Sequence, residues 1–145
     1  MHPRKQIREY LHGLINGMNT PRRIDKGTLT RYHDTDLPAV NVTTYTETVP
    51  EDTWLHGGDY IYEKEQQVQI VIYAPATDDF ESNIDDIEAE MWPLIMAFDM
   101  PGVDLRFEGS SMSTVEKAVT PQGARILTFT ARYEIKREDP NTIYD

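Results

Sequence analysis

The chain has 145 residues, 39% of them hydrophobic, and a formal net charge of -11 at pH 7. This length predicts a single domain, residues 1–145, with a core that needs no covalent staples. Because the sequence has no cysteine, disulfides, thiolate metal sites and a cysteine nucleophile are excluded. No apolar run approaches the roughly 20 residues that a membrane helix needs, so we expect no membrane partner.

Residues 3–18 predict an amphipathic helix, because apolar side chains recur at three- and four-residue steps. These side chains are Ile7, Leu11, Leu14, Ile15 and Met18. Residues 19–37 are polar, with a short extended piece expected near 28–32. Residues 38–47 are rich in β-branched and aromatic side chains, which predicts a strand that begins at Pro38.

Residues 48–59 predict a loop that is longer than ordinary hairpin turns. It carries two large apolar side chains, Trp54 and Leu55, in a segment otherwise suited to solvent. They either fold back on the core or form a contact surface. We favour the contact surface, because an aromatic side chain in a loop suits an interface. We expect this loop to be mobile in the free protein and to become ordered on a partner.

The segment 67–98 organises the fold. Val68, Ile70 and Ile72 alternate with polar neighbours, which predicts a strand from near Tyr60 to Pro75 with one buried face. A helix follows from about Ser82, its apolar face formed by Ile84, Ile87, Met91, Leu94, Ile95 and Phe98. Ile87 and Met91 should pack against the sheet. Pro93 lies inside the pattern and predicts a kink or a helix in two pieces.

Two strands close the sequence. The first begins at Val103, has a bulge or bend near Gly109 and extends to about Val119. The second spans 127–136 and has the cleanest alternation, with one face formed by Leu127, Phe129, Ala131, Tyr133 and Ile135. The tail, residues 137–145, is polar and expected to be frayed.

The order α-β-β-α-β-β predicts an α/β chain of the α+β type. We expect two layers: a four-stranded mixed sheet with two helices on one face, joined by a right-handed crossover.

Charge is distributed unevenly along the chain. Residues 1–31 hold seven Lys/Arg against two acids, a net of +5 that leaves -16 for the remainder. Residues 78–90 hold seven acids and no base. Such acidity disfavours gripping nucleic acid, which depends on neutralising phosphates. Opposite charges in two parts of a chain favour head-to-tail self-association, and a solvated acidic face beside a basic helix is the alternative.

The sequence predicts no catalytic residue, no cofactor site and no metal site. The four histidines are scattered, without HExxH spacing. The stretch His33-Asp34-Thr35-Asp36 offers oxygens to a cation, but a polar loop before a strand is the more common outcome. Gly57-Gly58 lacks the lysine of a phosphate loop, and the serines lack a GxSxG context.

Several stretches in succession resemble one family. They are Leu37–Val42 (LPAVNV), Ile72–Ala76 (IYAPA), the Trp92-Pro93 pair in an acidic helix, and Tyr133–Ile135 (YEI) ending the last strand. In this order, over nearly the whole chain, they resemble the lambda-type phage tail terminator, also called minor tail protein U. Residues 20–32 are longer and more basic than the family pattern, and the chain continues past the last strand.

The resemblance implies a structural virion protein and not an enzyme. Tail terminators form a hexameric ring on the last ring of the tail tube, stop tail polymerisation, and offer their other face to the head-completion protein. DNA slides through the lumen without specific binding. The resemblance implies a location in the virion tail, after assembly in the host cytoplasm.

Within this resemblance, the loop residues Trp54, Leu55 and His56 are expected to contact the tail tube. Arg22 and Arg23 of one subunit are expected to meet Asp85 and Asp86 of the next. Another head–tail joining or neck ring protein is an alternative. A small α/β ligand-binding domain or enzyme is a further one, with polar groups on the open sheet face from Tyr45, Arg106, Arg132 and Glu134. A pocket with convergent polar groups would favour that last reading.

Overall fold

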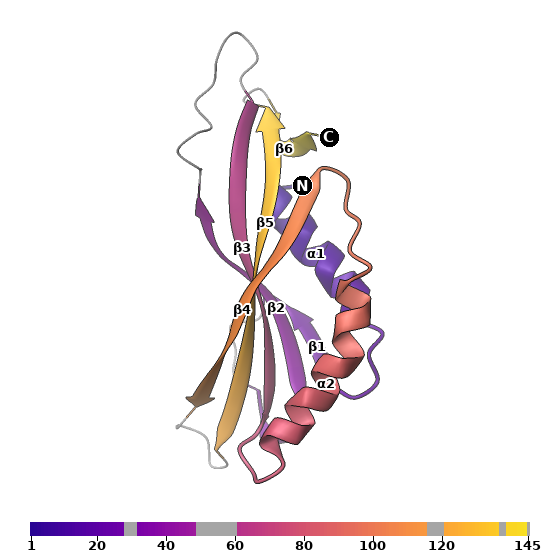
Figure 1. Cartoon of the computed structure of the whole chain (residues 1–145), viewed down its shortest axis with the longest axis vertical. Helices are drawn as coiled ribbons and strands as arrows, with labels where there is room; N and C mark the ends of the chain where they lie inside the picture. Colours follow the sequence, from indigo (N-terminus) through magenta and orange to yellow (C-terminus); the bar gives the residue numbers. More distant parts are fainter. Residues whose placement is uncertain (28–31, 49–60, 116–120, 137–138, 145) are drawn as a thin grey trace.

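The computed structural model describes residues 1–27, 32–48, 61–115, 121–136 and 139–144. Two α-helices, a short 3-10 helix and six strands follow one another along the chain (Figure 1). Their bounds are α1 (Pro3–Ile15), β1 (Arg23–Lys26), η1 (Asp34–Asp36), β2 (Ala39–Thr48), β3 (Ile61–Pro75), α2 (Phe80–Ile95), β4 (Val103–Val115), β5 (Gln122–Lys136) and β6 (Asp139–Tyr144).

The strands form one mixed sheet in the order β1-β2-β3-β5-β4, with β6 also paired to β5. β1 runs parallel to β2, and the other neighbours are antiparallel. Both helices lie on the same face of this strongly twisted sheet (Figure 1). The predicted α+β arrangement with two helices is therefore confirmed. The predicted four strands and their order are wrong, because β1 and β6 also join the sheet.

β1 is the first strand that periodicity missed. Its four residues show no alternation, and they are held by parallel pairing with β2. The backbone N–H of Arg22 donates to the Pro38 carbonyl at 2.8 Å, and that of Gly27 donates to the Val42 carbonyl at 2.7 Å. Gly27 has φ 64°, a conformation that favours glycine, and it ends the strand. The extended piece expected near 28–32 falls mainly on residues outside the described ranges.

β6 replaces most of the frayed tail expected from the sequence. Ile143 pairs with Ile135, and the Gln6 side chain of α1 donates to the Asn141 carbonyl at 2.9 Å. Gly102 lies directly beside this strand, where an added Cβ would come within 2.8 Å of the Tyr144 carbonyl oxygen. Pairing with β5 and contact with α1 thus order a polar segment that has no apolar face of its own.

α2 begins at Phe80, two residues before the predicted Ser82, and Asp79 at its N-cap makes no side-chain cap bond. The helix continues through Pro93 to Ile95, so the prediction of two separate pieces is wrong. Pro93 lies in the last turn, where a missing N–H costs only one bond close to the helix end.

The core lies between the two helices and the sheet. α1 contributes Ile7, Leu11 and Ile15, and α2 contributes Ile84, Ile87, Met91 and Ile95. Ile87 and Met91 have no exposed surface, which confirms their predicted burial. The alternation in β5 is also confirmed, since the five predicted inward side chains are all buried. A register shift between Phe107 and Gly109 confirms the bulge in β4.

A smaller cluster covers one end of the opposite sheet face. Tyr32, Leu37, Ala39 and Tyr73 pack there together. The Gln122 side chain fixes the covering segment by donating to the Tyr32 carbonyl at 3.1 Å. The segment before β2 therefore covers the end of the sheet where β3 stops and β5 starts.

Candidate functional site

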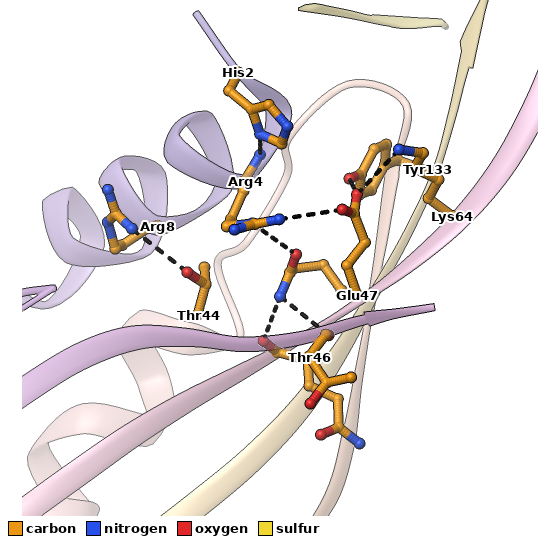
Figure 2. Close-up of polar contacts among 10 residues, drawn as sticks. His2, Arg4, Arg8, Thr44, Thr46, Glu47, Lys64 and Tyr133 are labelled. Atoms are coloured by element: carbon orange, nitrogen blue, oxygen red, sulfur yellow. Dashed lines mark hydrogen bonds and ion pairs between the residues drawn. The ribbon is translucent and has the colours of Figure 1, made fainter. Parts of the chain in front are cut away.

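A polar network joins the start of α1 to the ends of three strands (Figure 2). At its centre, the Glu47 carboxylate accepts a hydrogen bond from the Tyr133 hydroxyl at 2.7 Å. Arg4 Nη2 lies 3.2 Å from Oε2 of the same carboxylate, and Lys64 Nζ lies 3.4 Å from its Oε1. One acid thus ties together α1, β2, β3 and β5.

Local sequence explains why these groups meet. A bulge between Thr44 and Glu47 shifts the register of β2 against β3 near the end of the strand. Opposite it, Gln66 is fully buried, accepts from Arg4 Nε at 3.2 Å and donates to the Thr46 carbonyl at 3.1 Å. Gln66 lies on the same face of β3 as the buried apolar residues Val68, Ile70 and Ile72. A polar residue at a core position signals a buried partner, and the sequence-based prediction missed it.

The electrostatics of the network favour an ionised Glu47. Burial opposes the charge, but the Tyr133 hydroxyl, Lys64 and Arg4 together lower the pKa of Glu47 below its usual value. Burial and the neighbouring carboxylate raise the pKa of Tyr133, so the phenol keeps its proton and acts as the donor. Because Glu47 and Gln66 both contact Arg4 and neighbouring strands, the network stabilises the ends of β2 and β3, the strands that flank residues 49–60.

We expect Glu47→Gln to lower the free energy of unfolding by about 1–2 kcal/mol at pH 7, because the ion pairs with Arg4 and Lys64 are lost and the hydrogen bond from Tyr133 is weakened. Glu47 has a lowered pKa when folded, so its stabilisation is present above its unfolded pKa of about 4.3 and is lost as pH falls through the folded value. Urea unfolding at pH 7 and at successively lower pH should show the two proteins converging. Glu81→Gln, the same change at an exposed acid, is the control. An equal effect from both substitutions would contradict this role for Glu47.

The residues expected at the tail tube, Trp54, Leu55 and His56, lie outside the described residues. Their role stays a prediction.

The four residues expected between subunits are placed, and three of them have polar contacts within the chain. Arg23 lies 3.2 Å from Asp25, and Arg22 donates to the Thr35 carbonyl at 3.2 Å. Asp85 lies 2.7 Å from Arg125. Arg22 and Asp86 line one hollow of about 310 Å³, together with Thr20, Pro38, Pro75 and Asn83. A role between subunits is not tested by a single chain.

The open sheet face holds paired charges. Arg132 lies 2.6 Å from Glu63 and 2.7 Å from Glu65. Arg106 and Arg132 share a hollow of about 50 Å³, lined also by Glu65, Asp104, Glu108 and Thr130. Arg132 and Glu134 line a second, wider hollow nearby. Tyr45 is 68% exposed and lines neither hollow. The structure thus brings together three of the four polar residues expected on this face.

In the stretch considered for a cation, residues 33–36, both aspartates already accept hydrogen bonds from other groups of the chain. Asp36 accepts from the backbone N–H of His33 at 3.2 Å, and Asp34 accepts from the Gln122 side chain at 3.2 Å. Within the described ranges, no group of three or more acidic or histidine side chains is placed to hold a metal ion.

Comparisons with known proteins found no match from which a function could be assigned. No protein-family model matches the chain, and no curated protein matches it. In the described part of the chain, no helix is long and apolar enough to cross a membrane.

Proposed function

We propose that this chain is a phage tail terminator. It is a structural virion protein that forms a hexameric ring on the end of the tail tube, stops tail polymerisation and provides the surface for head joining. Its partners are further copies of itself, the tail tube protein and the head-completion protein, and DNA passes through the lumen without specific binding. It performs no catalysis and holds no cofactor.

The observation that carries this proposal is the pairing of charges on the open sheet face. Arg132 lines two hollows on this face, but its guanidinium is paired with two glutamates, Glu63 and Glu65. The hollow that it shares with Arg106 has a volume of about 50 Å³, and the hollow that it shares with Glu134 is a wide, open depression of about 460 Å³. Pockets for small ligands have volumes of roughly 300–1,000 Å³ and converge on a few polar groups. The wider hollow has such a volume but is open to solvent, and its arginine is already paired, so this face suits contact with another protein better than it suits substrate binding.

A second observation supports ring formation. The exposed acids of α2 and the basic residues of α1 and β1 lie on different elements, which allows the chain to present two surfaces of opposite charge. A ring requires two different, mutually complementary surfaces on each subunit. The residues that resemble the tail terminator family supply the remaining support.

The test uses the purified full chain and the tail tube protein of the same virus. We expect the chain to arrest tube elongation and to appear as a ring at one tube end in negative-stain images, which gives shorter and more uniform tubes. Tube protein alone is the control. Tubes of unchanged length with bare ends would overturn the proposal. Rings that leave tube length unchanged but bind the head side would favour a neck ring protein instead.

A further inference from the structure

The two sides of the sheet carry different surfaces. β1 lies at one edge of the strand order and β4 at the other. α1 contacts β1 and β2, whereas α2 contacts β3 and reaches β4 through Trp92. Each sheet edge is therefore accompanied by a different helix, and both helices lie on the same face of the sheet (Figure 1).

The β4 side combines exposed apolar side chains with acids. We define the β4 flank as Asp85, Glu88, Trp92, Phe107 and Met112. The rings of Trp92 and Phe107 meet at 4.9 Å, yet Phe107 remains 45% exposed and Met112 remains 48% exposed. Arg125 contacts both carboxylates, at 2.7 Å from Asp85 and 3.0 Å from Glu88. Two carboxylates share one guanidinium, so this apolar strip has a net negative border.

The β1 side is basic. We define the basic flank as Lys5, Arg8, Arg23 and Lys26, with three carboxylates, Glu9, Asp25 and Asp36, among them. Glu9 is shared by Lys5 at 3.9 Å and Lys26 at 3.6 Å. Arg23 lies 3.2 Å from the Asp25 carboxylate and 3.6 Å from that of Asp36, and Arg8 contacts the Thr44 hydroxyl at 3.4 Å. Four cations against three carboxylates leave this flank with a small positive charge.

We infer that the basic flank of one copy seats on the β4 flank of a second copy, an inference that rests on the ring assembly of the proposed function. The contact would cover Phe107 and Met112, whose exposed apolar surface favours burial. Lys26 and its neighbours would meet Asp85 and Glu88 of the second copy. Because these charges are opposite, the basic flank binds the β4 flank of a second copy more favourably than it binds another basic flank.

The placement of the flanks also determines the type of contact. Because they lie at opposite sheet edges, one neighbour cannot cover both in a two-fold symmetric pair. Each copy therefore binds one neighbour on each side, in a head-to-tail arrangement. Such a contact closes into a ring or continues as a filament.

The absence of cysteine makes crosslinking a clean test of this contact. Lys26→Cys combined with Asp85→Cys puts one thiol on each flank, and the Asp85 side chain is 66% exposed. A short bis-maleimide should give a ladder beyond the dimer on a denaturing gel. Each single variant has one thiol per chain and can link only two chains. Lys26→Cys combined with Met96→Cys is the matched control, because Met96 is exposed but outside the β4 flank.

A second measurement addresses the apolar part of the contact. Met112→Arg should require about tenfold more protein for association in light scattering, because it places a cation against the basic flank. Met96→Arg is the same substitution outside the flank and should associate as the native chain does. Melting curves of both variants report whether they fold.

The contact is overturned if the double-cysteine chain gives no ladder, if the Met96 control gives an equal ladder, or if Met112→Arg and Met96→Arg associate alike. The tube assay with the native chain tests the proposed function independently of the crosslinking test of this contact. A chain that arrests tubes without forming the ladder keeps the proposed function and rejects this contact. A chain that forms the ladder without arresting tubes keeps the contact and rejects the proposed function.

Discussion

Ile87→Ala is expected to lower the free energy of unfolding by roughly 2–5 kcal/mol, the range for truncating a buried aliphatic side chain. Ile87 has no exposed surface and lies on the face of α2 that packs against the sheet. The cost combines lost burial with a cavity that its neighbours fill only in part. Chemical denaturation should show the loss directly, and the melting temperature should fall by roughly 5 °C or more.

Met96→Ala provides the control for that result. Met96 directly follows α2 and is 80% exposed, so truncation removes little buried surface. Surface substitutions of this kind change stability by about 0.5 kcal/mol or less. Equal losses for the two variants would contradict the assignment of the buried face of α2.

The sequence predicted the elements whose side chains repeat with a regular period. Apolar residues of α1, α2, β3 and β5 recur at the helix or strand spacing, and the structure buries those faces. This was possible because each long element must place one apolar face on a shared core. The bulge in β4 was also predictable, because glycine inside a strand pattern weakens regular pairing.

The missed strands depend on contacts between distant segments. β1 has four residues and is defined by its pairing with β2, and β6 is polar and ordered by β5 and α1. Neither has a periodic signal, so only the long-range pairing reveals it. The break in α2 that was one of the two outcomes expected at Pro93 does not occur. A proline removes one hydrogen bond, and in the last turn of a helix this loss does not end the helix.

The candidate surfaces were predictable only as charges. The sequence showed a basic N-terminal part and an acidic middle part. It did not show where these charged residues lie on the surface of the folded chain. The structure shows that Asp85 is already matched by Arg125 and that Arg23 is matched by Asp25. Pairing inside the chain thus uses part of the charge that the sequence offered to a neighbour. The exposed apolar strip on β4 had no sequence signal, because Phe107 lies on the strand face directed toward the core.

The loop at residues 48–59 gives the largest expected functional effect. Its apolar pair, Trp54 and Leu55, lies outside the described residues, between the flanking strands β2 and β3. The Glu47 network anchors the end of β2 to β3 and β5. A loop that connects two well-anchored strands can present an aromatic side chain to a partner, and changes in that side chain leave the fold intact.

Trp54→Ala with Leu55→Ser is therefore expected to leave a folded chain that still forms rings but no longer caps tails. Loss of an aromatic anchor at the centre of an interface costs about 2 kcal/mol or more, which weakens binding roughly 30-fold. Negative-stain images should then show tubes of uncontrolled length, while melting curves and light scattering match the native protein. Tyr45→Ala truncates an exposed aromatic on β2 outside the loop and should give tubes of normal length. If the loop variant also produced tubes of normal length, the loop would not be the tube-facing surface, and the opposite end of the ring would have to meet the tube.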